Sequence, residues 1–362
     1  MTSPTYFLTG ATGHVGGAVL ARLLRDPQAS VFVLVRDHAR WRLVAERAGA
    51  AAVRITPVPG DLTSERLGAD ERTRRALRAR GCRVIHLAAD TCFSRSLPLA
   101  RLVNTEGTRN ALAFARDIEA RRVAHVSTAF VAGCRTGPIA DDSFDDAGWV
   151  NGYERSKYEA EVLVRTQATP WTILRPSMIV CDDAYGRITA INAVHRSLRL
   201  LHAGLASMLP GDERNGIDVV TADWVADSIS RLTDEPAAEG RTLHLCAGRH
   251  ALPLGELLDR TYDVWSRDPA WHRRAVSRPA LTDLETYRLF ERSVEESADP
   301  RLQRVVRSLS HFIAQLALPK VFDTTGVEAL LGAGAPKPAS YWDAMVERLL
   351  AHGFAAPARA AA

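Results

Sequence analysis

The sequence has few cysteines and no long apolar run. Its five cysteines are scattered, odd in number and without CxxC spacing, which argues against a disulfide framework and against a zinc site. No apolar stretch approaches the roughly 20 residues that a membrane-spanning helix needs. The first residues lead directly into an apolar strand, without the charged and then apolar leader of a signal peptide. We therefore expect a cytoplasmic protein with no metal centre and no membrane span.

A strong charge imbalance is also missing. The 46 lysines and arginines and the 42 acidic residues leave a net charge of +4 over 362 residues. Because a nucleic-acid-binding protein usually shows a concentrated basic face, we expect no nucleic-acid partner. The hydrophobic content of 46% is enough for a sizeable core. The length suits one large domain or two closely joined ones.

Short apolar runs alternate with helical stretches through the first half of the chain. Pro57 interrupts the third run, which favours an edge strand at that place. This alternation predicts an α/β Rossmann fold, a doubly wound parallel sheet that binds ligands at the carboxyl ends of its strands. The expected strands are residues 6–9, 31–35, 53–58, 84–87, 123–126 and 171–174, and the expected helices are 15–24, 99–116 and 152–166.

A glycine-rich turn, TGATGHVG, separates the first expected strand from the first expected helix. Gly10 permits a tight turn, Gly13 lets the backbone approach a pyrophosphate, and Gly16 lets the helix and strand pack closely. The helix start then offers free N–H groups and a positive dipole end to phosphates. The turn predicts a dinucleotide site; a turn without a ligand is the alternative. The candidate cofactor residues here are Thr9, Gly10, Thr12, Gly13, His14, Val15 and Gly16.

The residues after the second strand bear on the choice between NADPH and NADH. Arg36 ends that strand and Arg42 lies in the following helix. A forked guanidinium suits the 2′-phosphate of NADPH, whereas an acidic residue suits the ribose hydroxyls of NADH. We predict NADPH from the two arginines. One alternative is that Asp37 accepts hydrogen bonds from the ribose hydroxyls. The other is that Arg36 and Arg42 are only solvated and bind no ligand.

Further cofactor candidates end the third and fourth strands. Asp61, in the sequence GDL with Leu62, is placed to accept a hydrogen bond from the adenine amino group or, equally, to cap a turn. Ala88 and Ala89 end the fourth strand, where small side chains would let a cofactor lie close to the backbone.

Tyr153 and Lys157 are four residues apart in a helical context, so they share one face. A phenol can donate a proton to a carbonyl oxygen as hydride reaches the carbon. A neighbouring ammonium stabilises the phenolate and is expected to lower its pKa. Thr128, which ends the fifth strand, is placed to hydrogen-bond the substrate oxygen. The three side chains are the candidate catalytic residues.

These motifs together resemble the extended short-chain dehydrogenase/reductase family over about residues 5–250. The matching segments are TGATGHVG, GDL, HLAAD, STAFVAG, YERSK and LRPSMIV. The longer segments HVSTAFVAG, NGYERSKYEAE and TILRPSMIV resemble the branch that holds fatty acyl-CoA reductases and thioester reductase domains. The resemblance implies that Thr128, Tyr153 and Lys157 form the catalytic triad. It also implies that Asn104, as the family's helix asparagine, belongs to the cofactor site together with Tyr153 and Lys157, whose ammonium can hold the nicotinamide ribose hydroxyls. Pro176, Ser177 and Met178 are implied to line the nicotinamide.

Residues 1–180 are expected to form an NADP-binding Rossmann domain, with residues 216–248 returning to its sheet. The alternation weakens after this domain, and residues 181–215 and 249–354 are assigned to a smaller, mostly helical substrate-binding lobe. Residues 265–281 are expected to form a loop whose arginines are solvated or, alternatively, meet an acidic carrier protein or the phosphates of coenzyme A. The low-complexity tail 355–362 is expected to be disordered.

The resemblance implies an NADPH-dependent reductase that transfers hydride to an acyl thioester or the derived aldehyde, giving an aldehyde or an alcohol. No adenylation or carrier segment is recognisable, so the acyl group is expected on coenzyme A or on a separate acyl or peptidyl carrier protein. A sugar-nucleotide epimerase or a ketone or hydroxysteroid dehydrogenase shares the same first half and stays an alternative. A non-catalytic NADP-sensing regulator is a third reading, but such proteins typically lack the tyrosine–lysine pair.

Overall fold

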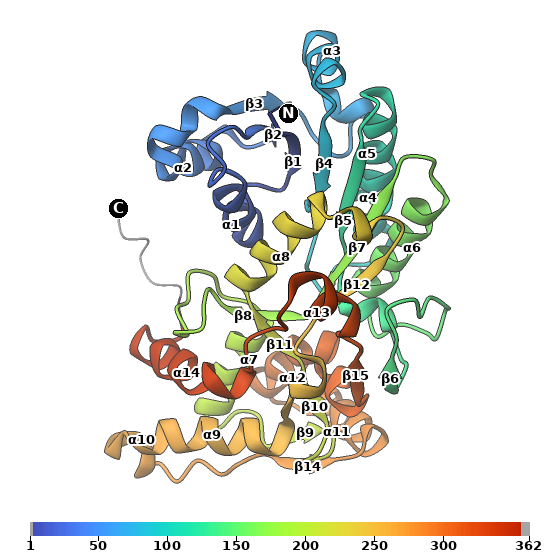
Figure 1. Ribbon diagram of the computed structural model, residues 1–362. Helices are drawn as coiled ribbons and strands as arrows, with labels where there is room; N and C mark the ends of the chain where they lie inside the picture. The colour runs from blue at the N-terminus through green and yellow to red at the C-terminus, as the bar shows by residue number, and fades with distance from the viewer. Residues whose placement is uncertain (1–2, 356–362) are drawn as a thin grey trace.

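A seven-stranded sheet forms the upper part of the molecule (Figure 1) in a computed structural model that describes residues 3–355. Its order is β12-β7-β5-β4-β1-β2-β3, and every neighbouring pair is parallel. The order reverses between β1 and β4, which is the switch point where such sheets bind ligands. The strands are β1 (Thr5–Thr9), β2 (Ser30–Val35), β3 (Ile55–Pro59), β4 (Arg83–His86), β5 (Arg122–Val126), β7 (Trp171–Pro176) and β12 (Thr242–Leu245).

Helices cover both faces of this sheet and give it two cores. Because successive strand residues point to opposite faces, Leu8 packs with Val19 and Ile229 on one side, while Phe7 contacts Phe114 on the other, with ring centroids 4.4 Å apart. The first face carries α1 (His14–Leu23), α2 (His38–Ala48) and α8 (Ala222–Asp234). The second carries α3 (Glu71–Arg80), α5 (Glu106–Asp117) and α6 (Gly152–Thr166), with α4 (Leu97–Asn104) packed against α6.

The predicted Rossmann architecture is confirmed, including the edge position of β3 that Pro57 favoured. Three details differ from the sequence expectation. The helix expected at 99–116 is two helices that meet at Thr105, whose hydroxyl donates to the carbonyl of Ser156 on α6. Residues 217–220 pair outside the seven-stranded sheet. The expected loop at 265–281 contains the end of the helix α9 (Leu254–Ser266), a short helix and a strand, because the buried rings of Trp265 and Trp271 anchor it to the lobe.

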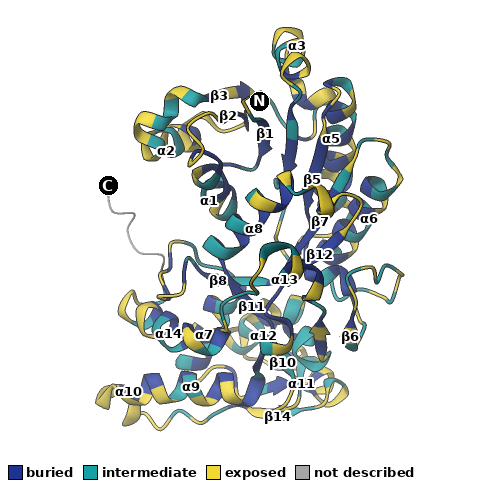
Figure 2. Cartoon of the chain, viewed as in Figure 1, coloured by how far each residue is buried: buried dark blue, intermediate teal, exposed yellow. Residues whose placement is uncertain are grey.

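The lower part of the molecule is a mostly helical lobe with its own apolar core, visible as buried segments in Figure 2. Trp265 and Trp342 are fully buried there. Its helices are α7 (Ala193–His202), α9 (Leu254–Ser266), α10 (Pro269–His272), α11 (Leu284–Glu296), α12 (Pro300–Ile313) and α14 (Trp342–Ala351). The helix α13 (Thr325–Leu331) instead packs against α8 and β12 of the upper part. The domain boundaries given above stay a prediction, and residues 356–362 of the expected tail lie outside the described residues.

Short strand pairs lie outside the seven-stranded sheet. They are β6 (Gly137–Ile139) with β15 (Lys320–Phe322), β8 (Met178–Cys181) with β11 (Val219–Thr221), β9 (Met208–Pro210) with β14 (Ala280–Thr282), and β10 (Gly216–Ile217) with β13 (Leu252–Pro253). Among residues 3–355, no helix combines the length and the apolar character that a membrane crossing requires.

Candidate active site

A cleft of about 1390 Å³ lies between the carboxyl ends of the sheet strands and the helical lobe. One wall comes from the strand ends and from α6, and the other from α7 and α12. The cleft brings together predicted site residues from five separate stretches of sequence. They are His14, Val15, Ala89, Thr128, Tyr153, Lys157, Pro176, Ser177 and Met178.

Tyr153 lies in the first turn of α6, whose start is fixed by a cap. The Asn151 side chain accepts a hydrogen bond from the backbone N–H of Glu154 at 3.0 Å, and its amide donates to the carbonyl of His311 on α12. Gly152 approaches the start of α4 so closely that a Cβ there would lie 3.0 Å from backbone atoms of Leu97. The cap and this close contact hold Tyr153 at the floor of the cleft.

Burial raises the pKa of Tyr153 to about 12, although a hydrogen bond with Thr128 stabilises the phenolate and acts in the opposite direction. The sequence argument expected a lowered pKa because of Lys157. That expectation is wrong for the protein alone, since loss of water outweighs the other influences on this 7%-exposed ring. The phenol therefore stays protonated at neutral pH, which is the form that a proton donor needs.

Lys157 lies one helical turn beyond Tyr153 and is also buried. Its ammonium donates to the carbonyl oxygen of Val126 at 2.9 Å. Burial lowers the pKa of Lys157 to about 8, while the negative charge of Glu161 raises it. Glu161 in turn forms a buried two-pronged ion pair with Arg175, at 2.9 and 2.8 Å. Arg175 thus holds in place the carboxylate whose negative charge favours the protonated lysine.

Asn104 holds the segment after β4 against α6. Its side-chain oxygen accepts from the backbone N–H of Asp90 at 2.8 Å, and its amide donates to the Asp90 carbonyl and to Ser156 Oγ. Ser156 Oγ donates to the carbonyl of Tyr153 at 2.8 Å. The polar atoms of Asn104 are therefore engaged within the protein. Its place in this network is that of a positioning residue behind Tyr153.

The glycine turn has the shape of a phosphate cradle. Gly10 has a φ of +82°, and a Cβ there would lie 2.8 Å from the backbone nitrogen of Ala88. A Cβ on Gly16 would lie only 2.0 Å from the carbonyl oxygen of Gly10. Gly13 precedes α1 without a side-chain cap, and the first turn carries no acidic residue. The free N–H groups at this helix start fit a pyrophosphate.

The other predicted cofactor residues lie outside the cleft lining. Thr9 Oγ1 is buried and accepts from the backbone N–H groups of Leu87 and Ala88, both at 3.1 Å, so it fixes the turn itself. Leu62 belongs to the apolar core and contacts Gly107 of α5. Both residues therefore support the cofactor side of the sheet from within the protein.

At the ends of β2 and β3, the acidic side chains are hydrogen-bonded within the protein, whereas the arginine side chains are exposed. Asp37 caps α2 by accepting from the N–H groups of Ala39 and Arg40, each at 3.0 Å. Arg36 is 75% exposed and lies 3.6 Å from Asp61, whose carboxylate also accepts from Thr63. Arg42 is exposed on α2. Asp61 therefore holds a turn beside Arg36, and the side chains of Arg36 and Arg42 are exposed.

Sequence reasoning missed three aromatic side chains of the cleft. The ring of Phe93 meets Tyr153 edge-on, with centroids 5.3 Å apart, and contacts Phe130 and Phe312 at 6.3 and 6.1 Å. Phe93 lies three residues after the end of the HLAAD segment, and this short distance is a signal for its position. Phe312 lies on a lobe helix without a recognisable motif, so only the fold reveals its contact with Phe93.

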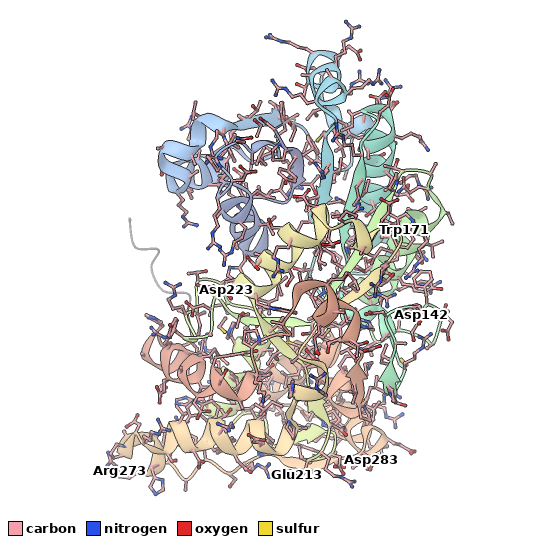
Figure 3. The ribbon with its side chains drawn as sticks, viewed as in Figure 1. Asp142, Trp171, Glu213, Asp223, Arg273 and Asp283 are labelled. Atoms are coloured by element: carbon pink, nitrogen blue, oxygen red, sulfur yellow. The ribbon has the colours of Figure 1, made fainter. Side chains whose placement is uncertain are left out.

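The basic residues of the cleft also differ from the expectation. Arg196, Arg199 and Arg307 line it, and no ion pair to a carboxylate is found for them within residues 3–355. Of the arginines at 265–281, Arg278 pairs with Glu213 at 2.8 Å, and Arg273 lies at the outer end of the lobe (Figure 3). That segment therefore does not supply the cleft's positive charge.

The fold and the cleft define an NAD(P)-dependent reductase of the extended short-chain dehydrogenase/reductase type. A protein family described as "Male sterility protein" matches residues 8–229, and the chain belongs to this family. Across the described part of the chain, no group of histidine, cysteine and acidic side chains is arranged to hold a metal ion.

Curated relatives and solved structures agree with this assignment. The chain is 28% identical to the nonribosomal peptide synthetase asaC of Aspergillus flavus over 66% of its own length and 26% of that protein. It is 26% identical to the L-2-aminoadipate reductase large subunit of Penicillium chrysogenum over 91% of its length and 25% of that protein. The chain thus spans about a quarter of these relatives.

Among solved structures, the terminal R domain from the myxalamid PKS-NRPS biosynthetic pathway is similar, with a TM-score of 0.77 and 25% identity. The match covers 98% of this chain and 92% of that chain. The reductase domain of a nonribosomal peptide synthetase from Mycobacterium tuberculosis shares the fold, with a TM-score of 0.67. The thioester-reductase-like branch that the sequence motifs indicated is confirmed.

Proposed function

We propose that this chain uses NADPH to reduce an acyl thioester to an aldehyde, with Tyr153 as the proton donor. The observation that carries the proposal is that Thr128, Lys157 and the buried, protonated Tyr153 line one cleft that also reaches the glycine turn. Names of relatives, a nonribosomal peptide synthetase and an aldehyde reductase among them, support this reaction class.

The chemistry assigns a separate role to each side chain. The glycine turn would hold NADPH, which would supply a hydride for the thioester carbonyl carbon. Tyr153 donates its proton to the carbonyl oxygen. Thr128 hydrogen-bonds the carbonyl oxygen and the phenol oxygen of Tyr153, which share the negative charge that develops during the transfer. The product is a hemithioacetal, whose hydroxyl proton passes to sulfur as the C–S bond breaks, leaving an aldehyde and a free thiol. The Lys157 ammonium stabilises the tyrosinate that remains.

Two features support NADPH over NADH. The Asp37 carboxylate is engaged by two backbone N–H groups of α2, which makes it a poor ribose ligand. Arg36 and Arg42 are exposed at the same edge of the sheet, where a guanidinium suits a 2′-phosphate.

The acyl group is proposed to arrive on a phosphopantetheine arm, either in coenzyme A or on a carrier protein. Arg196 and Arg199 on α7 and Arg307 on α12 form a positive rim around the cleft with no carboxylate partner among residues 3–355. Guanidinium groups of this kind bind phosphate strongly. A phosphate at the rim would leave the arm free to carry the thioester toward Tyr153.

The proposal is tested by following NADPH absorbance and identifying products with butanoyl-CoA, butanoyl pantetheine, butanal and a panel of ketones. We expect thioester-dependent oxidation of NADPH with release of thiol and formation of butanal or butanol. Weaker turnover of butanoyl pantetheine, which lacks the phosphates, would support the arginine rim. Reduction of ketones alone would overturn the proposed function.

A further inference from the structure

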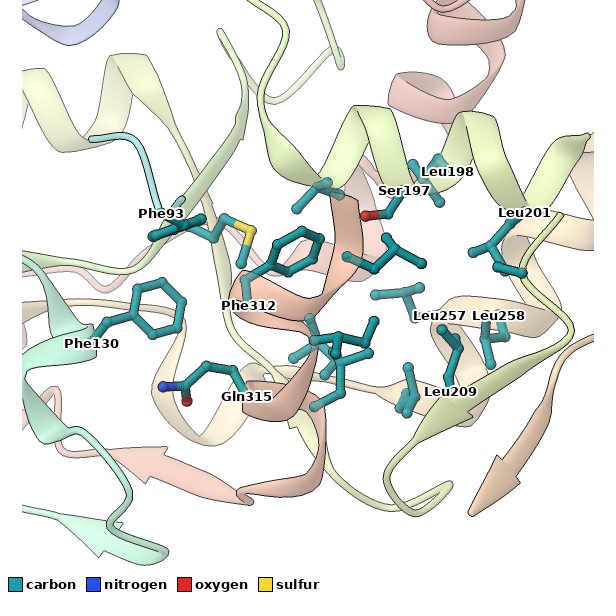
Figure 4. Close-up of a pocket in the computed structure, with 18 of the residues that line it drawn as sticks. Phe93, Phe130, Ser197, Leu198, Leu201, Leu209, Leu257, Leu258, Phe312 and Gln315 are labelled. Atoms are coloured by element: carbon teal, nitrogen blue, oxygen red, sulfur yellow. The ribbon is translucent and has the colours of Figure 1, made fainter. Parts of the chain in front are cut away.

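A second cavity, which we call the leucine chamber, lies on the lobe side of the cleft (Figure 4). Its volume is about 90 Å³, several times the roughly 10–15 Å³ that one water needs. The chamber and the catalytic cleft share a wall made of Phe93, Phe130, Met178, Ser197, Leu309 and Phe312. The far end of the chamber is formed by leucines and by Trp342, which do not line the cleft.

The shared wall brings the chamber next to the reacting group. Phe93 contacts Tyr153 on one side, with ring centroids 5.3 Å apart, and Phe312 on the other, at 6.1 Å. Figure 4 shows Phe93 and Phe130 at one end of the chamber and Leu201, Leu257 and Leu258 at the other. A chain that extends from a carbonyl group near Tyr153 past Phe93 would therefore enter the leucine chamber.

Every polar side chain of the lining has its polar atoms engaged by the protein. Both oxygens of Glu154 accept hydrogen bonds, from Gln315, Asn151 and the backbone of Val150. The oxygen of Gln315 accepts from Lys320 Nζ at 2.7 Å.

The two remaining polar lining residues follow the same pattern. Ser197 Oγ donates to the carbonyl of Ala193, and Trp342 Nε1 donates to Thr261 Oγ1. A ligand in the chamber would therefore meet no polar side-chain atom that lacks a hydrogen bond within the protein.

We propose that the leucine chamber binds the tail of the acyl group and selects an unsubstituted hydrocarbon chain over a peptidyl or hydroxylated one. This inference rests on the proposed function, because it takes the thioester carbonyl to lie at Tyr153. A peptide or hydroxyl group placed in the chamber would lose its hydrogen bonds to water without replacement, which costs free energy. A methylene group placed there gains from leaving water.

The first test measures kcat/KM for reduction of acetyl, butanoyl, hexanoyl and octanoyl pantetheine thioesters. We expect kcat/KM to rise about fourfold per methylene until the chamber is full. A terminal hydroxyl on the hexanoyl chain should lower kcat/KM about tenfold. Reduction of all these thioesters at equal rates would overturn the leucine chamber proposal and leave the proposed function standing. Failure to reduce any thioester would contradict the proposed function itself.

The second test fills the chamber with Ala206→Leu, because Ala206 lines it away from the shared wall. We expect an approximately tenfold loss of kcat/KM for octanoyl and little change for butanoyl thioester. The matched control is Ala270→Leu, at an exposed position on α10 that lines neither cavity. A parallel loss for both chain lengths, or the same change in the control, would contradict the proposal. If Ala206→Leu does not fold, the chain-length series with the unaltered protein alone tests whether the leucine chamber binds the acyl tail.

Discussion

The Lys157 ammonium donates its hydrogen bond to the carbonyl oxygen of Val126, 2.9 Å away at the end of β5. This contact holds the side chain between the strand and α6, where it is only 2% exposed. Because burial disfavours the charged form, the pKa of Lys157 falls from 10.5 to about 8. The lysine thus changes charge close to the neutral range.

The pH dependence of reduction should report this titration. The ammonium is the active form, so kcat/KM is expected to be high below pH 8 and to fall as pH rises through about 8. A pH-rate profile with a short-chain thioester measures the alkaline limb. Activity that persists unchanged toward the ordinary lysine pKa of about 10.4 would contradict the role of the Lys157 charge.

The close contact between Gly16 and Gly10 predicts that cofactor binding requires a glycine at position 16. Gly16→Ala places a methyl group against the carbonyl of Gly10, where a Cβ would lie at 2.0 Å, so the phosphate cradle must distort. We expect dinucleotide affinity to fall at least about tenfold, measured by titration of protein fluorescence. Gly17→Ala is the matched control, because its Cβ has only an ordinary contact, at 3.6 Å from Ala11. Equal affinities in the two variants would show that the turn does not cradle the cofactor.

Cofactor preference should depend on Arg36. Arg36→Ala removes a charged partner of the 2′-phosphate, so the Kd for NADPH is expected to rise about tenfold or more while the Kd for NADH barely changes. Arg25→Ala, at an exposed position after α1, serves as the control. If Arg36→Ala weakens both cofactors equally, or neither, the NADPH assignment loses its main support.

The buried ion pair of Glu161 and Arg175 should matter for stability. Glu161→Ala leaves the Arg175 charge buried without its partner, and we expect the free energy of unfolding to fall by about 3–5 kcal/mol. Urea denaturation measures this change. Glu159→Ala, on the same helix but paired with Arg101 and Arg155 near the surface, should cost about 0–1 kcal/mol. Similar losses in both variants would contradict the difference between buried and exposed pairs.

Much of the domain that holds the cofactor could be predicted, because the motifs that mark it each lie within a few consecutive residues. The glycine turn and the short apolar strands each depend on neighbouring residues, and Pro57 correctly indicated the edge strand. The lobe carries no such motif: Phe312 and Arg307 reach the cleft only through the packing of α12. The pKa of Tyr153 also escaped prediction, because burial is a property of the folded chain and outweighs the contacts readable from sequence.

The proton donor is the centre of this account, and Tyr153→Phe tests it directly. Removing the hydroxyl should lower kcat for thioester reduction about a hundredfold or more while NADPH affinity changes little. Tyr158→Phe is the control, because Tyr158 lies on the same helix with its ring stacked on Phe144. We predict this loss of about a hundredfold or more in Tyr153→Phe and near-normal turnover in Tyr158→Phe; unchanged turnover in Tyr153→Phe would contradict the mechanism.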